Sequence, residues 1–437
     1  MSELWRELPA VAQDSLVLLV FVVPAILVGS LVVRGFAPGP LVRALLWRFR
    51  WANAMFVALI AVSVGMGIGL LAQERGLRVG TAEAARKFDL IVSAPGSELT
   101  MLFAAVFLQP SDVPLLDGET YNSVANHNNV ALAAPLAFGD SVGDSPVVGT
   151  TWDLVDHLTD GAYAGRAWAR SDEAIIGATV PLNIGDVFVP AHGHGATADA
   201  SAHEGTEITV VGRMAPTGSP WDRAVLTPVE SVWEVHGLAN GHAPERGDQI
   251  GPPFDAPYFP GTPAIIVQAD ALWANYALRS EFTRENETMA FFPGAVLANL
   301  FEVMGDIRQV MSLMALVTQV LVACSVLLGL FILSRLFRRQ IAVLRALGAP
   351  ARFVFAVVWS YGAILLTVGA LLGVAAGYLA VVALSRLVTL RTDIAVTAQL
   401  GWSEIHFVAA FFTLTSLLSL LPALLVLRQP VVDGLRT

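Results

Sequence analysis

Lysine is almost absent from this sequence: Lys87 is the only one among 437 residues, and the other basic side chains are arginines. A phosphate-binding P-loop places a lysine directly after its second glycine. Lys87 stands instead in the segment AARKFD, with no glycine-rich loop before it. The chain is therefore expected to have no ATPase activity by itself, and any ATP-driven work would need the ATP and Mg²⁺ bound by a separate subunit.

Cysteine and charged residues are also scarce. The single cysteine, Cys324, lies inside an apolar run, which excludes an intrachain disulfide. Charged residues make up 14% of the chain and hydrophobic residues 55%. This composition is typical of a membrane protein that also carries a large polar domain. No Ser/His/Asp nucleophile motif, HExxH motif or paired-acid motif occurs, so we predict no catalytic residues.

Basic charge is depleted from the middle of the chain. Residues 73–305 hold 29 Asp and Glu against 11 Lys and Arg, a net charge of −18, whereas the remainder holds 7 against 15, a net of +8. An acidic middle disfavours binding to nucleic acid, which needs a basic surface. Basic segments near apolar runs stay on the cytoplasmic side of a membrane. The middle segment is therefore predicted to lie outside the cell membrane.

Five apolar runs are long enough to be membrane-spanning helices, since about 20 residues cross a bilayer. They are Leu16–Val33, Met55–Leu71, Val310–Leu333, Phe353–Leu384 and His406–Leu427. Arginines follow the first run, which places its far end inside and the N-terminus outside. A re-entrant or interfacial helix is the alternative for that run. Residues 385–405 are predicted to be an outer loop.

Glycines recur at a spacing of four in two of these runs. Gly65 and Gly69 form one such pair, and the second run carries Gly369, Gly373 and Gly377. Small residues at this spacing let membrane helices approach closely. They are expected to pack against another span of the same chain, with a contact between two copies as the alternative.

The short basic segment RRQIAVLRALGAP, residues 338–350, separates two of the apolar runs. Ile341, Leu344 and Leu347 fall on one helical face, and Gly348 followed by Pro350 predicts a helix end. A helix this short cannot cross a bilayer. We interpret it as a coupling helix at the cytoplasmic face, the alternative being a basic loop that only fixes orientation.

The middle segment alternates between strand-type and helix-type runs, which predicts an α+β domain of two lobes. The expected strands are Asp89–Val92, Val130–Phe138, Val147–Trp152, Glu173–Ile176, Asp186–Val189, Glu207–Gly212 and Ala264–Gln268. The expected helices are Leu99–Leu108, Val229–His236 and Ala271–Thr283.

Seven of the eight histidines lie in this segment, and the loop AHGHGATADASAHEG concentrates several of them. Imidazole and carboxylate ligands suit zinc, so His192, His194, His203 and Glu204 are predicted as zinc ligands. The spacing matches no recognised metal motif, and a solvated connector is the alternative. His127 and His236 are expected to be surface residues or to be bonded locally.

Two stretches resemble a known family. RRQIAVLRALGAPARF, the glycine-spaced run after it and the closing LPALLVLRQPVVDGLR resemble the C-terminal module of FtsX/MacB-like ABC transporter permeases. AARKFDLIVSAPGS and GTEITVVGRMAPTGSPWDRAVLTPVESVWEVHG look like the outer domain of that family. The resemblance covers roughly residues 41–437, whereas the first span departs from the four-span family pattern.

The resemblance implies a permease subunit in the bacterial cytoplasmic (inner) membrane. Such a subunit couples ATP hydrolysis by a separate cytoplasmic ABC ATPase to movements of its outer domain, and it pairs with a second permease copy. A substrate-binding or accessory protein outside the membrane is a further possible partner. The motor contacts carried over to this sequence are Arg339, Gln340, Ile341, Leu344, Arg345, Leu347 and Gly348. A signal transmitter that activates an outer partner, and a scaffold without ATP coupling, stay open as alternatives.

The predicted fold is thus an α-helical membrane domain of four core spans plus an extra N-terminal span, with a large α+β extracytoplasmic domain. The expected parts are an N-terminal membrane helix in 1–40, an amphipathic elbow and first core span in 41–72, the outer domain in 73–305, and the FtsX-like module in 306–437.

Overall fold

A computed structural model describes residues 8–109, 112–193, 199, 203, 205–247, 249–284, 287–336, 338–392 and 394–427. The chain divides into two compact units. We call residues 1–76, 305–386 and 397–437 the helical unit, and residues 77–304 and 387–396 the sheet unit.

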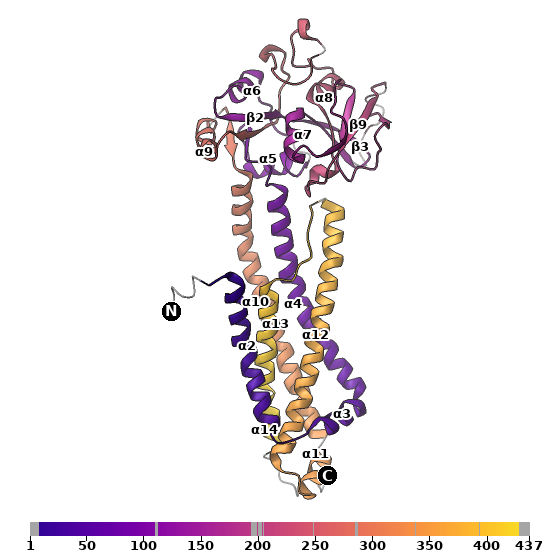
Figure 1. Cartoon of the computed structure of the whole chain (residues 1–437), viewed down its shortest axis with the longest axis vertical. Helices are drawn as coiled ribbons and strands as arrows, with labels where there is room; N and C mark the ends of the chain where they lie inside the picture. Colours follow the sequence, from indigo (N-terminus) through magenta and orange to yellow (C-terminus); the bar gives the residue numbers. More distant parts are fainter. Residues whose placement is uncertain are drawn as a thin grey trace. The chain divides into compact units, whose positions relative to one another are not determined.

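The helical unit is built from apolar helices that run past one another (Figure 1). Their bounds, including the parts of α4, α10 and α12 that extend into the sheet unit, are α2 (Ala10–Val33), α3 (Gly39–Arg48), α4 (Arg50–Ala84), α10 (Pro293–Leu336), α11 (Arg338–Ala346), α12 (Ala351–Thr392), α13 (Trp402–Leu418) and α14 (Leu420–Leu427). By length and composition, α2, α4 and α12 can cross a membrane, and α10 and α13 contribute shorter apolar stretches among the described residues. The molecule is therefore a membrane protein, and the number of spans stays a prediction.

The N-terminal helix α2 packs along α13 within the helical unit. Thr413 Oγ1 donates a hydrogen bond to the carbonyl oxygen of Phe21 at 2.5 Å. His406 Nε2 lies 2.8 Å from the carbonyl oxygen of Asp14, close enough to donate to it. Both contacts join side chains of α13 to the backbone of α2 and hold the two helices in register.

The sheet unit contains two β-sheets. The smaller has the order β12-β1-β11-β2, and the larger has the order β5-β9-β6-β10-β4-β3-β8, with β7 paired to β9. The strands are β1 (Leu90–Ser93), β2 (Val130–Pro135), β3 (Ala137–Val142), β4 (Ser145–Thr150), β5 (Tyr163–Gly165), β6 (Glu173–Ile176), β7 (Val187–Phe188), β8 (Ala191–His192), β9 (Ile208–Met214), β10 (Val225–Pro228), β11 (Ala264–Ala269) and β12 (Met289–Phe291).

Both faces of these sheets are covered, which explains why strands such as β1 and β6 are buried at every position. Successive side chains point to opposite faces, so Ile91 joins one hydrophobic cluster whereas Leu90 and Val92 join another. Each cluster takes residues from both sheets. The two sheets therefore share their hydrophobic cores, and the division of this domain into two lobes stays a prediction.

Five short α-helices among the described residues of the sheet unit supply the covering layers. The first cluster includes residues of α5 (Glu98–Ala105) and α7 (Trp152–Thr159). The second includes residues of α6 (Gly118–Ala125), α8 (Val229–Val235) and α9 (Leu272–Glu281). Helices α5 and α6 begin at side-chain caps from Ser97 and Asp117. The end of α4 adds Ala84 to the first cluster. The result is the predicted α+β domain.

The seven predicted strands and three predicted helices of this domain are confirmed with shifted ends. The run Val130–Phe138 is divided at Leu136 into β2 and β3. The very short strands β5, β8 and β12 were not predicted, because two or three residues carry no readable alternation.

The predicted outer loop at residues 385–405 is wrong in its first part. Helix α12 continues to Thr392, and residues 387–396 belong to the sheet unit. Ile394 and Val396 are buried in the first hydrophobic cluster. Two apolar residues in a polar stretch give no sequence pattern, so this return of the chain into the sheet unit could not be foreseen.

Candidate functional site

Four metal-ligating side chains converge at one edge of the larger sheet. Asp140 comes from β3, His192 from β8, His203 from a turn, and His236 from the residue that caps α8. One ligand atom of each lies within 4.8 Å of the others. Asp140 and His192 are paired residues in the β3–β8 ladder, so the strand pairing itself brings them together.

The histidines surround a single carboxylate oxygen. Asp140 Oδ1 lies 3.1 Å from His203 Nε2, 3.3 Å from His192 Nδ1 and 3.5 Å from His236 Nε2. The side chains of Asp140 and His203 are 2% and 8% exposed, whereas that of His192 is 55% exposed. The site is thus buried on the sheet side and open to solvent at His192.

Two glycines shape this edge. Gly139 has a φ of +153°, and a Cβ there would lie 3.3 Å from both Cε1 and Nε2 of His236. Gly193 follows His192 with a φ of +87°, and its N–H donates to the carbonyl of Gly139 at 2.8 Å. Ser141 Oγ donates to the carbonyl of Gly193 at 2.7 Å. These bonds hold the end of β8 against β3, where the imidazole of His192 meets Asp140.

The structure brings together only part of the predicted zinc set. His192 and His203 belong to the cluster, whereas His194 and Glu204 lie outside the described residues. Asp140 and His236 were missed. The expected local bond of His236 is present, since its Nδ1 lies 2.7 Å from the carbonyl of Val232, but its Nε2 faces the cluster. Asp140 and His236 are far in sequence from the histidine-rich loop, so no local pattern pointed to them. They lie near His192 because β3 pairs with β8 and because α8 ends at His236.

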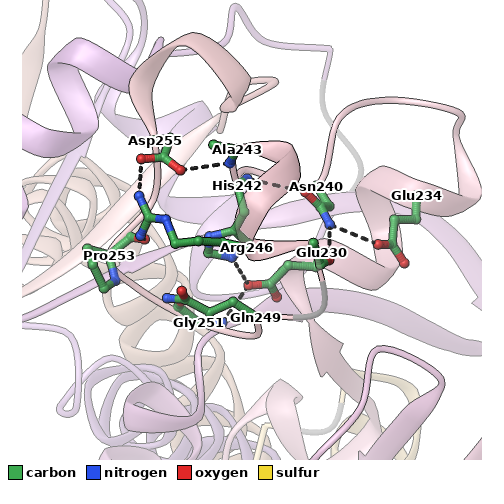
Figure 2. Close-up of polar contacts among 11 residues, drawn as sticks. Glu230, Glu234, Asn240, His242, Ala243, Arg246, Gln249, Gly251, Pro253 and Asp255 are labelled. Carbon is green, nitrogen blue, oxygen red and sulfur yellow. Dashed lines mark hydrogen bonds and ion pairs between the residues drawn. The ribbon is translucent and has the colours of Figure 1, made fainter.

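A second polar cluster joins Glu230 of α8 to residues of the segment that follows this helix (Figure 2). Glu230 and His242 are fully buried, and His242 Nε2 lies 3.4 Å from Glu230 Oε1. The backbone N–H of Gly251 donates to that same oxygen at 2.5 Å. Glu230 Oε2 and His242 Nδ1 have no hydrogen-bond partner among the described residues. The pair is therefore incompletely satisfied and would carry charge only at a cost.

Burial is the main cause of both pKa shifts in this pair. It raises the pKa of Glu230 to about 7, partly offset by hydrogen bonds to the backbone N–H groups of Glu230 itself and Gly251. It also lowers the pKa of His242, and the nearby Arg246 lowers it further. Arg246 is in turn ion-paired with Asp255 at the edge of the network. Both shifts favour the neutral forms.

The predicted coupling segment forms α11, which ends at Ala346. The N–H groups of Gly348 and Ala349 donate to the carbonyls of Arg345 and Leu344, and Gly348 has a φ of +94°. This is a Schellman ending, so the helix end predicted at Gly348 is confirmed. Leu347 is 80% exposed, whereas Leu344 and Arg345 are half-buried. The side chains of Arg339, Gln340 and Ile341 are outside the described part.

The glycine-bearing faces of α4 and α12 meet inside the helical unit. A Cβ at Gly377 would lie 2.9 Å from the carbonyl oxygen of Gly65, and one at Gly373 would lie 2.7 Å from Val64 Cβ. Gly369 is packed against Ile60 in the same way. Around Gly69, by contrast, nothing described lies within 4 Å of an added Cβ.

The single lysine lies in the sheet unit and is used locally. Lys87 forms an ion pair with Asp160, and its Nζ donates to the carbonyl of His157 at 3.2 Å. These contacts tie the residues after α4 to the end of α7. These contacts with α7 and the residue after it fix the position of the Lys87 side chain.

Comparisons with known proteins identify the C-terminal part of the chain. Residues 311–431 match the family model "FtsX-like permease C-terminal". The periplasmic region of MacB from Actinobacillus actinomycetemcomitans aligns with a TM-score of 0.30 and 10% identity, covering 49% of this chain and 94% of that one. No curated protein matches the chain. The family match spans α11 and the apolar helices on both sides of it, so this part of the chain is similar to the C-terminal module of FtsX-like permeases.

Proposed function

We propose that this chain transmits ATP-driven movement of a separate cytoplasmic ATPase to its outer domain, and so moves or extracts a substrate. The observation that carries this proposal is α11 with its exposed apolar end. Leu347 and Val343 are 80% and 43% exposed at the end of a short basic helix, between α10 and α12 of the family-matched region. Exposed leucine beside arginine suits an apolar pocket with an acidic rim on a partner protein.

The lengths of three helices support transmission over a distance. α4, α10 and α12 contain 35, 44 and 42 residues. At 1.5 Å per residue they measure about 50–65 Å, whereas the hydrocarbon core of a bilayer is about 30 Å thick. The boundaries between the helical unit and the sheet unit fall inside these three helices. When one end of such an unbroken helix tilts, the movement is therefore transmitted along the helix to the other unit.

A second copy of the chain is part of the proposal. A groove of about 660 Å³ lies open beside Gly69, and it is lined by residues of α4 and α12, among them the exposed Met66, and by Met314 of α10. Small residues along an open groove suit close approach of another apolar helix. The mass of the purified complex, measured by light scattering in detergent, tests this: a strictly monomeric permease would contradict it.

The decisive experiment changes the exposed end of α11. Burying a leucine side chain contributes about 1.5–3 kcal/mol, so Leu347→Asp should weaken the complex with the ATPase at least about tenfold. Leu272 on α9 is 81% exposed and lies in the sheet unit, which makes Leu272→Asp the matched control. The measurements are affinity for the ATPase and the rate of ATP hydrolysis by the reconstituted complex.

The purified chain alone should hydrolyse no ATP, and the complex with its ATPase should. We expect Leu347→Asp to lose binding and coupled hydrolysis while Leu272→Asp keeps both. Equal activity of parent and Leu347→Asp would remove the assignment of α11, and ATP turnover by the isolated chain would contradict the need for a separate motor.

A further inference from the structure

We propose that Asp140, His192, His203 and His236 form a zinc site that fastens the end of β8 and the turn at His203 to β3 and α8. This inference is independent of ATP coupling and concerns the sheet unit alone. It also differs from the ligand set predicted by sequence, because two of its four members lie far from the histidine-rich loop. The donors are three imidazoles and one carboxylate, all ligands that Zn²⁺ accepts.

The spacing of the four ligand atoms fits a tetrahedral ion. Zinc bonds to nitrogen and oxygen are about 2.0–2.2 Å long, so the edges of a tetrahedral site measure about 3.3–3.5 Å. The three separations from Asp140 Oδ1 are 3.1, 3.3 and 3.5 Å, and His236 Nε2 lies 3.3 Å from His192 Nδ1. Three of these four edges lie within the range that a bound ion requires, and the Asp140–His203 edge, at 3.1 Å, is slightly shorter.

While His236 is neutral, the same arrangement is costly without a cation. The carbonyl of Val232 can only accept, so the hydrogen of a neutral His236 is on Nδ1, 2.7 Å from that oxygen. Nε2 then presents a lone pair to Asp140 Oδ1 and to His192 Nδ1. A lone pair facing a carboxylate oxygen that is 2% exposed is repulsive. A cation among the four atoms converts this repulsion into ligation.

The bond from His236 to Val232 is also the outer contact typical of a metal-bound histidine. Such histidines donate their other ring N–H to a backbone carbonyl or carboxylate, which fixes the tautomer and the ring orientation. Gly139 leaves the room that this ring orientation needs, since any Cβ there would lie 3.3 Å from it. Four protein ligands complete a tetrahedral shell, which is the pattern of structural rather than hydrolytic zinc.

The test is a zinc titration of the full-length chain in detergent, freed of metal with a chelator and titrated with ZnCl₂ against a colour-forming chelator. We expect one zinc per chain, and at least a tenfold loss of affinity in Asp140→Asn, His192→Ala, His203→Ala and His236→Ala. His127→Ala is the matched control, because His127 is a histidine of the same unit that pairs with Glu281. His194→Ala tests the ligand set predicted from sequence.

Two further readouts separate ligation from misfolding. CoCl₂ should give the intense visible absorption of tetrahedral Co²⁺ with the parent and not with Asp140→Asn, a nearly isosteric change. Zinc should raise the melting temperature of the parent and leave that of Asp140→Asn unchanged. The proposal is overturned if Asp140→Asn and His236→Ala bind zinc as the parent does. It is equally overturned if His127→Ala or His194→Ala loses as much affinity as His203→Ala.

Discussion

At the scale of single residues, burial changes the protonation state of Glu230. Its carboxyl group lies in a fully buried pair with His242, and burial raises its pKa from 4.5 to about 7. The charge of Glu234 adds to this rise, and Glu230 in turn raises the pKa of the buried Tyr121. A proton is therefore held in the folded chain at pH values where an unfolded chain has released it.

This proton sets the sign of a pH effect on stability. Between about pH 4.5 and pH 7 the folded state binds more protons at Glu230 than the unfolded state. The free energy of unfolding contributed by this group therefore falls as the pH rises through that window, and it levels off above about 7. At 1.36 kcal/mol per pKa unit, the whole effect is at most about 3 kcal/mol.

Glu230→Gln should remove this dependence, because an amide copies the protonated carboxyl and does not titrate. We expect the variant to be more stable than the parent at pH 8 by up to about 3 kcal/mol, with little difference near pH 4.5. Thermal unfolding of the full-length chain across this pH range measures it. Glu207→Gln, at an exposed carboxylate that is not among the causes of the Glu230 pKa shift, is the control. Parallel curves for parent and Glu230→Gln would rule out the buried proton.

At the scale of elements, the close contact between α4 and α12 depends on glycines, which have no side chain, at the points where the two helices meet. The faces meet where Gly65 and Gly377 approach through backbone atoms, and the flanking core contains Ile60, Val64 and Ile68. Backbone cannot move aside as a flexible side chain can. A methyl group placed in this contact must therefore separate the two helices.

Gly377→Ala is expected to destabilise the helical unit, because its Cβ would lie 2.9 Å from the carbonyl oxygen of Gly65. Overpacking of this kind costs about 1–3 kcal/mol. Gly305→Ala in α10 is the matched control: an added Cβ meets nothing described within 4 Å, and alanine favours helix by about 1 kcal/mol. Melting temperatures in detergent should fall for Gly377→Ala and not for Gly305→Ala. The opposite order would mean that the two helices do not meet in this way.

At the scale of the whole molecule, charge and hydropathy predict which parts face the cytoplasm. The predicted outer domain carries a net charge of −18, whereas the rest carries +8. Three exposed positions test this when each carries a single cysteine: Asp144, Ala346 and Val11. Cys324 is an exposed thiol and must be replaced first.

Asp144→Cys should react with a membrane-impermeant thiol reagent added to intact cells, and Ala346→Cys should react only after the membrane is opened. Val11→Cys should behave like Asp144→Cys if α2 crosses the membrane with its N-terminus outside. Labelling is measured by the mass of the modified chain. Reaction of Ala346→Cys in intact cells would place α11 outside and exclude its contact with a cytoplasmic ATPase.

Much of this protein follows from local sequence. The apolar runs, the stop at Gly348 and the strand-type runs each depend on neighbouring residues, so composition and periodicity were enough to predict helices and strands. The resemblance to FtsX/MacB-like permeases was instead carried by particular stretches such as RRQIAVLRALGAPARF. The four-residue glycine spacing likewise predicts a close helix contact, because spacing along one helix decides which residues share a face.

Tertiary structure alone decided the rest, because it depends on pairs far apart in the chain. Asp140 and His192 meet through a strand pairing between residues 52 apart, and His236 joins them from the end of α8. Ile394 enters the core of the sheet unit although it lies between α12 and α13 in the FtsX-like region. No local sequence pattern predicts contacts between residues that are so far apart in the chain. Sequence therefore determined which ligand types and which helices this chain has, and folding determined which of those ligands share one site.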